Sequence, residues 1–212
     1  MNVGMIGLGK MGANMAERLR RHGHTVVGMD PAKPDAEAHT LDELVPLLDA
    51  PGQPRVAWSM VPAGPITDQT IQRLGELLSA GDLVVDGGNS NYLDSIRHGE
   101  ELAAKGIHFV DCGTSGGVWG LENGYALMVG GSAADVALAD EVFTALAPPN
   151  GYAHVGPVGA GHYTKMVHNG IEYGLMQAYA EGYAILDAAP LEIDVPAAFA
   201  CWQQGSVVRS WL

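Results

Sequence analysis

The chain has 212 residues, 47% of them hydrophobic, which suits one domain of ordinary size followed by a smaller second unit. Its formal net charge of −13 excludes a general attraction for nucleic acid or an anionic membrane surface, because phosphate binding needs concentrated Lys and Arg. The sequence contains neither a stretch of about 18 or more apolar residues nor a signal-peptide pattern, so we expect a cytoplasmic protein without a membrane partner. Its two cysteines, Cys112 and Cys201, fit neither a disulfide framework nor a paired zinc motif.

Strand and helix patterns alternate along most of the chain. Apolar runs at residues 3–7 and 25–29 flank an amphipathic stretch that ends near residue 21, which predicts strand, helix, strand. The further predicted helices cover residues 41–48, 66–78, 92–104 and 133–147, and the further predicted strands cover residues 55–61, 82–86, 107–111, 126–129 and 152–155. This alternation predicts the α/β class, with a doubly wound parallel sheet and helices on both faces.

The sequence GLGKMG at residues 7–12 fits the pattern G-x-G-x-x-G. It follows a predicted strand and opens a predicted helix, which is the setting of a Rossmann-type dinucleotide-binding turn. Gly7 would permit the tight turn, Gly9 the approach of a pyrophosphate, and Gly12 the contact between helix and strand. The alternative is a glycine turn in an α/β protein that binds no nucleotide. The predicted cofactor contacts in this turn are Gly7, Leu8, Gly9, Lys10, Met11 and Gly12.

Asp30 ends the second predicted strand. A carboxylate at this place accepts hydrogen bonds from both ribose hydroxyls of NAD and repels the additional 2′-phosphate of NADP. Lys33 lies close by in the sequence and partly offsets that repulsion. We therefore predict that NAD is the preferred cofactor and that NADP is still accepted.

Two further turns follow predicted strands, VPAG at residues 61–64 and DGGNS at residues 86–90. Both fall at carboxyl ends of strands, where ligands bind in open α/β sheets. The predicted cofactor contacts in these turns are Val61, Pro62, Ala63 and Asn89. The amide of Asn89 also suits holding a substrate oxygen near the nicotinamide. As the alternative, Asn89 and Ser90 only cap the helix that follows.

A break in the pattern near residue 156 predicts a domain boundary. We predict a dinucleotide-binding domain over residues 1–156 and the start of an all-helical second domain over residues 157–212. The second part contains a long helix to about residue 188 and one or two helices after Pro190. Because so short a helical segment leaves apolar residues without partners, we expect a truncated chain whose second domain is incomplete.

The helix predicted after residue 160 gathers polar residues on one side. At about 100° per residue, Lys165, His168, Asn169 and Glu172 lie within one arc, which in most helices faces a core. Burying an ammonium, a carboxylate and an imidazole together is costly unless they are paired or line a cleft. The arc therefore lines a ligand site or, as the alternative, forms an exposed network of i,i+4 pairs. His168 and Glu172 have the spacing of a metal pair, but no third ligand is evident, so we predict no metal.

Four sequence blocks together resemble the decarboxylating 6-phosphogluconate dehydrogenases: GLGKMG at 7–12, DGGNS at 86–90, DCGTSGG at 111–117 and KMVHNGIEY at 165–173. Their order and spacing extend over almost the whole chain. The block GVWGLENG at residues 117–124 is similar to the shorter branch of the family, which favours NAD. The resemblance implies oxidation of 6-phosphogluconate, a phosphorylated sugar acid, at C3, followed by loss of carbon dioxide and release of ribulose 5-phosphate. It also implies a homo-oligomer formed through the helical domain.

The resemblance assigns roles to residues at matching positions. They are Asn89, Ser115, Gly116 and Gly117 for substrate contact, Lys165 as base and then acid, His168 and Asn169 for orientation, Glu172 as the second acid, and Tyr173 toward the phosphate. Arg209, in the run WQQGSVVRSW at residues 202–211, matches an arginine that binds the sugar phosphate, and a guanidinium fork suits that group. As the alternative, residues 115–117 only allow a loop to pack closely.

In this interpretation Lys165 begins neutral, which requires burial or a nearby cation to lower the pKa of its amine. After hydride transfer, its ammonium donates to the C3 carbonyl during decarboxylation, and Glu172 protonates C1 of the enediol. Thr114 is a mild departure, because many relatives carry an apolar residue there. Two other functions stay open: a related β-hydroxyacid dehydrogenase that does not decarboxylate, and a catalytically silent NAD-binding fragment.

Overall fold

The computed structural model describes residues 1–210, and for residues 209 and 210 it describes the backbone alone. The chain forms two compact units, Met1–Met166 and Val167–Leu212. The domain boundary near residue 156 rests on the sequence and remains a prediction.

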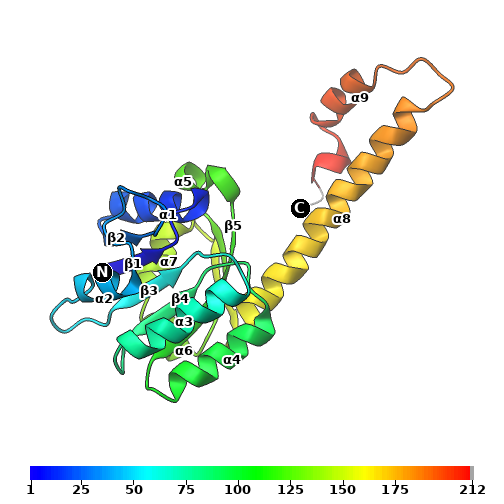
Figure 1. The fold of residues 1–212 in the computed structure, drawn as a ribbon. Coiled ribbons are helices and arrows are strands. Elements are labelled where there is room, and N and C mark those ends of the chain that lie inside the picture. The colour runs from blue at the N-terminus through cyan, green and yellow to red at the C-terminus, as the bar shows by residue number, and fades with distance from the viewer. Residues whose placement is uncertain (211–212) are drawn as a thin grey trace. The chain divides into compact units, whose positions relative to one another are not determined.

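A seven-stranded sheet forms the centre of the first unit (Figure 1). Its strands are β1 (Asn2–Ile6), β2 (Thr25–Met29), β3 (Val56–Ser59), β4 (Leu83–Asp86), β5 (His108–Ser115), β6 (Ala126–Gly130) and β7 (Tyr152–Gly156). They lie in the order β2-β1-β3-β4-β5-β6-β7. The order reverses between β1 and β3, and an open α/β sheet binds its ligand beside the carboxyl ends of the strands at such a point.

The doubly wound α/β fold that the sequence predicts is confirmed, with one difference in strand direction. Strands β1 to β5 pair in parallel, but β6 runs antiparallel to β5, and β7 is parallel to β6. A parallel crossover needs a connection of about a dozen or more residues, generally with a full helix. The connection from β5 to β6 holds only the short turns η1 (Gly117–Trp119) and α5 (Gly120–Asn123), so the chain returns in the opposite direction.

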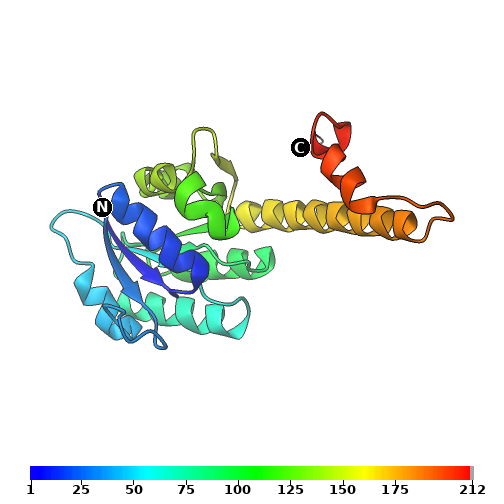
Figure 2. The ribbon, with the colours of Figure 1, turned by 90° about the horizontal axis from the view of Figure 1, so that it is seen from above.

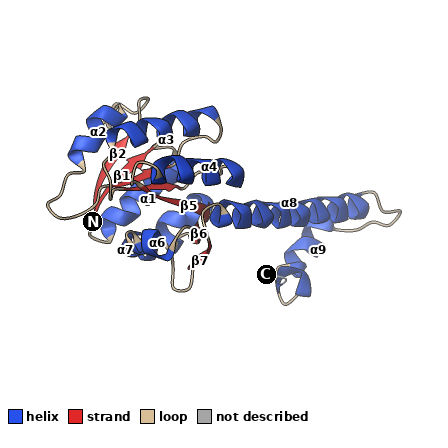
Figure 3. Ribbon diagram, turned by 90° about the horizontal axis from the view of Figure 1, so that it is seen from below, coloured by secondary structure: helices blue, strands red, loops and turns tan. Residues whose placement is uncertain are grey.

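Helices cover both faces of the sheet (Figure 3). They are α1 (Lys10–Arg21), α2 (Leu41–Leu47), α3 (Pro65–Leu77), α4 (Tyr92–Ala103), α6 (Ala133–Ala137) and α7 (Asp140–Leu146). Strand residues alternate between two apolar cores, as the twofold period of a strand requires. Val3 and Met5 of β1 pack with α1, α6 and α7, whereas Ile6 packs with α2, α3 and α4. The helix predicted over residues 133–147 is divided, because Ala139 leaves the helical conformation and becomes the N-cap of α7.

Helix α8 (Ala160–Asp187) begins in the first unit and continues through the second. The second unit also contains α9 (Val195–Trp202) and η2 (Val207–Ser210). Helix α9 folds back beside α8 (Figure 2). The rings of Tyr183 and Phe199 lie 5.4 Å apart between centroids and join the two helices. Within residues 1–210, every helix is too short or too polar to cross a membrane.

Candidate active site

A cleft of about 780 Å³ opens at the carboxyl ends of the central strands. It is lined by Gly7 after β1, Asp30 after β2, Val61 after β3, Asn89 after β4 and Thr114 of β5. Most of the turns that the sequence singles out therefore meet at one place. The cleft lies where the strand order reverses, which is the ligand position expected for this class of sheet.

The glycine turn fits a bound pyrophosphate. Gly7 has a φ of 89°, which a residue with a side chain rarely adopts. A Cβ on Gly12 would lie 2.0 Å from the carbonyl oxygen of Gly7, so the helix packs against the turn only because Gly12 has no side chain. A Cβ on Gly9 would meet no atom within 4 Å, and Gly9 lines the cleft at the start of α1. The first N–H groups of a helix have no partner within it, so this start is suited to an anion.

The Asp30 carboxylate is held in place by backbone N–H groups. Its Oδ2 accepts from Leu8 at 2.9 Å, and its Oδ1 accepts from Ala32 at 2.9 Å. Asp30 lines the cleft, and both of its carboxylate oxygens are held by these contacts. Lys33 is exposed and lines a separate cavity of about 200 Å³, together with Arg20 and other residues.

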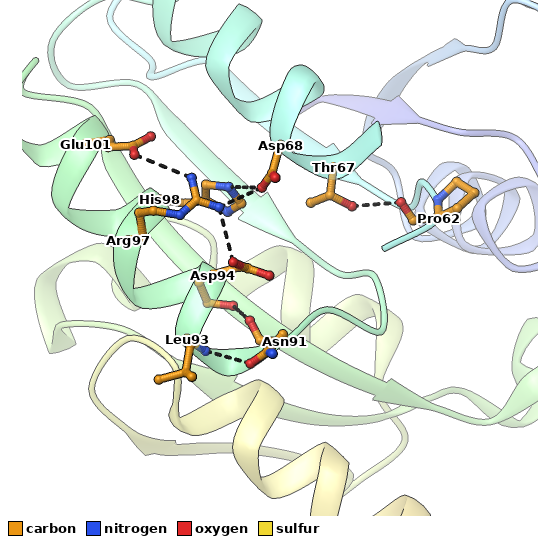
Figure 4. A network of polar contacts seen from close by, with 10 residues as sticks. Pro62, Thr67, Asp68, Asn91, Leu93, Asp94, Arg97, His98 and Glu101 are labelled. Atoms are coloured by element: carbon orange, nitrogen blue, oxygen red, sulfur yellow. Dashed lines mark hydrogen bonds and ion pairs between the residues drawn. The ribbon is translucent and has the colours of Figure 1, made fainter. Parts of the chain in front are cut away.

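Polar contacts brace the turns that follow β3 and β4 (Figure 4). The Thr67 hydroxyl donates to the carbonyl oxygen of Pro62 at 2.9 Å, which fastens the turn at residues 61–64 to α3. Asp68, one residue further on, lies 2.7 Å from Nε2 of the buried His98 and accepts from Arg97 at 2.8 Å. The Arg97 guanidinium holds the pKa of the Asp68 carboxyl below its ordinary value. Helices α3 and α4 are thereby joined close to the cleft.

Buried side chains hold the turn that contains Asn89 in place. A Cβ on Gly87 would lie 2.2 Å from Nε1 of Trp58, so only glycine fits there. The fully buried Asp86 carboxylate accepts from the Gly88 N–H at 3.1 Å. Asn89 itself is exposed and lines the cleft. The cap of α4 is Asn91, whose side chain accepts from the Leu93 N–H, so Asn89 is not the capping residue.

Lys165 lies in the first unit, on the first turns of α8. It is only 9% exposed, and its Cβ would lie 2.5 Å from a Cβ placed on Gly113. Gly113 is the neighbour of Thr114, which lines the cleft. Ser115 at the end of β5 is half-buried, and the exposed Gly116 and Gly117 follow with positive φ angles.

The other residues of the predicted polar arc lie in the second unit. His168 Nδ1 lies 3.8 Å from Glu172 Oε2 and 3.5 Å from Asn169 Oδ1. Glu172 and Tyr173 are exposed. The side chain of Arg209 lies outside the part of the chain that the structure describes. The roles of these residues and the substrate contacts at residues 115–117 remain predictions.

The sequence analysis missed several residues that support the cleft. Asp68 and His98 form a partly buried contact between helices α3 and α4, and Asp111 binds the start of α8. The pairing of Asp68 with His98 leaves no local signal, because the two residues are far apart in the chain. Asp111 stood within a recognised block, but only its neighbours received a role. Within residues 1–210, no three His, Cys, Asp or Glu side chains gather as a metal site would require.

The fold and the cleft define a dinucleotide-binding protein of the α/β class. Residues 2–156 match the model of the NAD binding domain of 6-phosphogluconate dehydrogenase, and residues 161–212 match that of the C-terminal domain of 6-phosphogluconate dehydrogenase. The chain belongs to the 6-phosphogluconate dehydrogenase family, which confirms the resemblance found in its sequence, and it is an oxidoreductase by class.

Three similar proteins show how far the similarity extends. The NAD(+)-dependent, decarboxylating 6-phosphogluconate dehydrogenase of Haloferax volcanii is 43% identical over 100% of this chain and 72% of its own length. The Bacillus subtilis protein of the same description is 38% identical over 100% of this chain, which spans 48% of that relative. The 6-phosphogluconate dehydrogenase structure from Plasmodium falciparum superposes with a TM-score of 0.83 at 28% identity, covering 97% of this chain and 48% of that one.

Proposed function

We propose that this chain oxidises and decarboxylates 6-phosphogluconate to ribulose 5-phosphate and carbon dioxide, with NAD as the preferred cofactor and NADP as a weaker one. The observation that carries the proposal is the burial of Lys165 against Gly113, next to the cleft residue Thr114. A buried amine beside a dinucleotide cleft supplies a group that is able to take a proton from a substrate hydroxyl. The predicted compartment remains the cytoplasm.

The cofactor end of the site is supported by the glycine turn and Asp30. The start of α1, with its open approach at Gly9, would hold the pyrophosphate, and Asp30 would accept from the ribose hydroxyls. When bound, the nicotinamide supplies the acceptor for the hydride. Val61, Pro62, Ala63 and Asn89 line the cleft on the side away from Asp30's strand and would contact the cofactor there.

The chemistry assigned to the side chains is proton transfer. Lys165 takes the proton of the C3 hydroxyl and returns it to the C3 oxygen as carbon dioxide leaves. Glu172 then protonates C1 of the enediol, the carbon that was C2 of the substrate, and His168 and Asn169 orient the substrate. Asn89 and the loop at residues 115–117 hold the sugar acid.

The phosphate end of the substrate is assigned to Tyr173 and Arg209. A phenol and a guanidinium offer donors to phosphate oxygens, and the guanidinium fork suits bidentate contact. Substituting either residue should raise the KM for 6-phosphogluconate more than it lowers kcat.

A direct assay tests the function. The 212-residue chain is incubated with 6-phosphogluconate and NAD, and both NADH and carbon dioxide are measured. Lys165→Ala should lower kcat by about 10²–10⁴-fold, the usual contribution of a positioned acid or base, while NAD affinity stays unchanged. Lys105→Ala is the matched control, because Lys105 is exposed and donates only to a carbonyl oxygen of α3. NADH formation without carbon dioxide would instead indicate a dehydrogenase that does not decarboxylate.

The acid role of Glu172 has its own test. Glu172→Gln keeps the size of the side chain and removes its proton, so ribulose 5-phosphate formation should slow more than hydride transfer. Single-turnover measurements of NADH and of product separate the two steps. Equal slowing of both steps would contradict this assignment.

The cofactor preference depends on Asp30. Wild-type protein should show a higher kcat/KM with NAD than with NADP, and Asp30→Ala should narrow that difference. The substitution removes the charge that repels a 2′-phosphate. A wild-type preference for NADP would refute this part of the proposal.

The second unit supports a homo-oligomer formed through the helical domain. Its described helices expose large apolar side chains: Val167, Ile171, Tyr173, Met176, Tyr179, Tyr183, Ile185, Leu191, Ile193 and Trp202. Exposed apolar side chains in this number favour association. Sedimentation of the chain at micromolar concentration should show a dimer or larger species, and a monomer would contradict the proposal.

A further inference from the structure

The start of α8 rests directly on the backbones of β5 and β6. A Cβ on Gly161 would lie 2.5 Å from the carbonyl oxygens of both Asp111 and Met128. A Cβ on Gly130 would lie 2.7 Å from the Gly161 nitrogen and 2.4 Å from Asp111. With Gly113, which contacts the stem of Lys165, these residues form what we call the helix seat: Asp111, Gly113, Gly130 and Gly161. Any larger side chain in the seat would lift α8 from the sheet.

The register of the sheet places the seat on one face. Asp111 pairs with Gly130 and Gly113 pairs with Met128 across the antiparallel β5–β6 ladder. Residues two apart in a strand point to the same side, so Asp111 and Gly113 face α8 together. Asp111 binds the first turn of α8, and Gly113 contacts Lys165. The two residues are therefore successive positions on the same face of β5.

Asp111 is the one charged member of the seat, and it is completely buried. Its Oδ1 accepts from the Gly159 N–H at 2.6 Å, and its Oδ2 accepts from the His162 N–H at 2.7 Å. Both donors lie at the N-terminal end of α8, where a negative charge also interacts favourably with the helix dipole. Because each oxygen faces an N–H donor, the site suits the ionised carboxylate, although burial raises the pKa of Asp111 against the opposing effect of His162 and these N–H groups.

A second contact joins the same turn to α4. The ring of His162 is buried, and its Nδ1 lies 2.7 Å from Oγ of the buried Ser95 and 4.0 Å from Asp111 Oδ2. The first turn of α8 is thus held on one side by β5 and on the other by α4. Lys165 follows His162 by one helical turn on this fixed segment.

We propose that Asp111 is a positioning residue, which fixes the first turn of α8 on the helix seat and thereby sets the place of the Lys165 amine. This inference rests on the proposed function only for the role of that amine as a base. An asparagine in place of Asp111 keeps the shape, but its NH₂ group must face one of the two N–H donors. One contact is lost and a repulsion replaces it, so the first turn loosens and Lys165 gains access to water.

Chemical labelling tests the position of Lys165 without any turnover. Trace acetic anhydride acetylates accessible amines, and peptide mass spectrometry compares Lys165 with the exposed Lys10 in the same sample. Asp111→Asn should raise the relative labelling of Lys165 about tenfold, the change expected from losing one charge-assisted hydrogen bond. Asp135→Asn is the matched control, because Asp135 holds only a partly exposed contact with His108 and should leave labelling unchanged.

The result that overturns the proposal is unchanged labelling in a folded Asp111 variant. If Asp111→Asn shows no cooperative unfolding transition, it is not folded, and the labelling is repeated with Asp111→Glu. Glu keeps the charge but is one methylene too long for the buried helix seat. Labelling of Lys165 should then rise as well, and unchanged labelling would again overturn the proposal.

Kinetics separate a positioning role from a merely structural one. Asp111→Asn should lower kcat about tenfold while NAD affinity remains that of the wild type, because the cofactor contacts at Gly9 and Asp30 follow other strands, β1 and β2. Parallel losses of kcat and NAD affinity would indicate general loosening and contradict the proposal. If the wild-type chain shows no turnover, the proposed function fails, and the labelling result still decides the role of Asp111.

Discussion

The two units of the molecule treat their apolar side chains in opposite ways. In the first unit, large side chains such as Trp58, Phe143 and Ile71 are almost completely buried in two cores. In the described part of the second unit, Val195 is the only buried hydrophobic residue, and side chains such as Ile185 and Leu191 are more than two-thirds exposed, at 72% and 71%.

This difference separates a unit that is stabilised by its own core from one whose described apolar side chains are mostly exposed. Full burial of one large apolar side chain stabilises a fold by about 1.5–3 kcal/mol, and the first unit contains many such residues. Helix α8 is stabilised at its start by the helix seat, but its later turns lack a core of this kind. Association through those turns would supply the missing burial.

A matched pair of isoleucines tests the comparison with the largest expected effect. Ile71→Ala, in α3, should lower the free energy of unfolding by about 2–5 kcal/mol, because the side chain is 1% exposed and leaves a cavity. Ile185→Ala, in α8, should change it by about 0.5 kcal/mol or less in the monomeric state, because that side chain is 72% exposed. Urea unfolding of both variants measures the difference. Similar losses would show that Ile185 is buried by association.

The two units also differ in how closely other atoms pack against their glycines. Gly12→Ala should lower the free energy of unfolding by about 1–3 kcal/mol, the usual cost of overpacking, because its Cβ would meet the Gly7 carbonyl oxygen at 2.0 Å. The displaced turn should also weaken NAD binding, measured by calorimetry. Gly182→Ala, in α8 of the second unit, is the control for an open position, because a Cβ there would meet no atom of this chain within 4 Å. Undiminished NAD affinity in Gly12→Ala would remove the glycine turn from the cofactor site.

The fold of the first unit was largely predictable because its signals are local. Alternating apolar periods and glycine turns fix each strand and helix within a few residues, and the order of elements then fixes the α/β class. The antiparallel β6 was not predictable, because strand direction depends on the length and path of the connection over residues 116–125. The break at Ala139 between α6 and α7 was missed because the apolar pattern continues across it.

The candidate site was predictable where the type of a residue, together with its place after a strand, indicates its chemical role. The glycine turn, Asp30 and Asn89 do meet at one cleft. The residues that hold the cleft in place were not predictable, because each acts through a partner distant in sequence. Asp111 contacts the start of α8, and Thr67 fastens the turn at residues 61–64.

The first unit also contains a carboxylate, Asp82, whose contribution to the free energy of unfolding should depend on pH. Burial raises the pKa of Asp82, but hydrogen bonds from Arg55 and from the Ser79 N–H outweigh it and lower the pKa below its ordinary value of 3.8. A lowered pKa stabilises the fold above pH 3.8, and this contribution is lost as the pH falls through the lower folded value. Asp82→Asn should therefore be less stable than wild type at neutral pH, by less than Gly12→Ala, and the difference should vanish in strong acid. A constant difference at all pH values would contradict this assignment.

The smallest expected effect concerns Gly182 in the exposed part of α8. A Cβ there would meet no atom within 4 Å of this chain, and alanine is favoured over glycine inside a helix by about 0.5–1 kcal/mol. Gly182→Ala should therefore raise helicity and stability slightly, as measured by circular dichroism during thermal unfolding, if this face of α8 stays in water. If a second copy packs closely against Gly182, the same methyl group instead meets a neighbouring backbone. Sedimentation would then show weaker association, and the sign of this one substitution would locate the surface that the second unit buries.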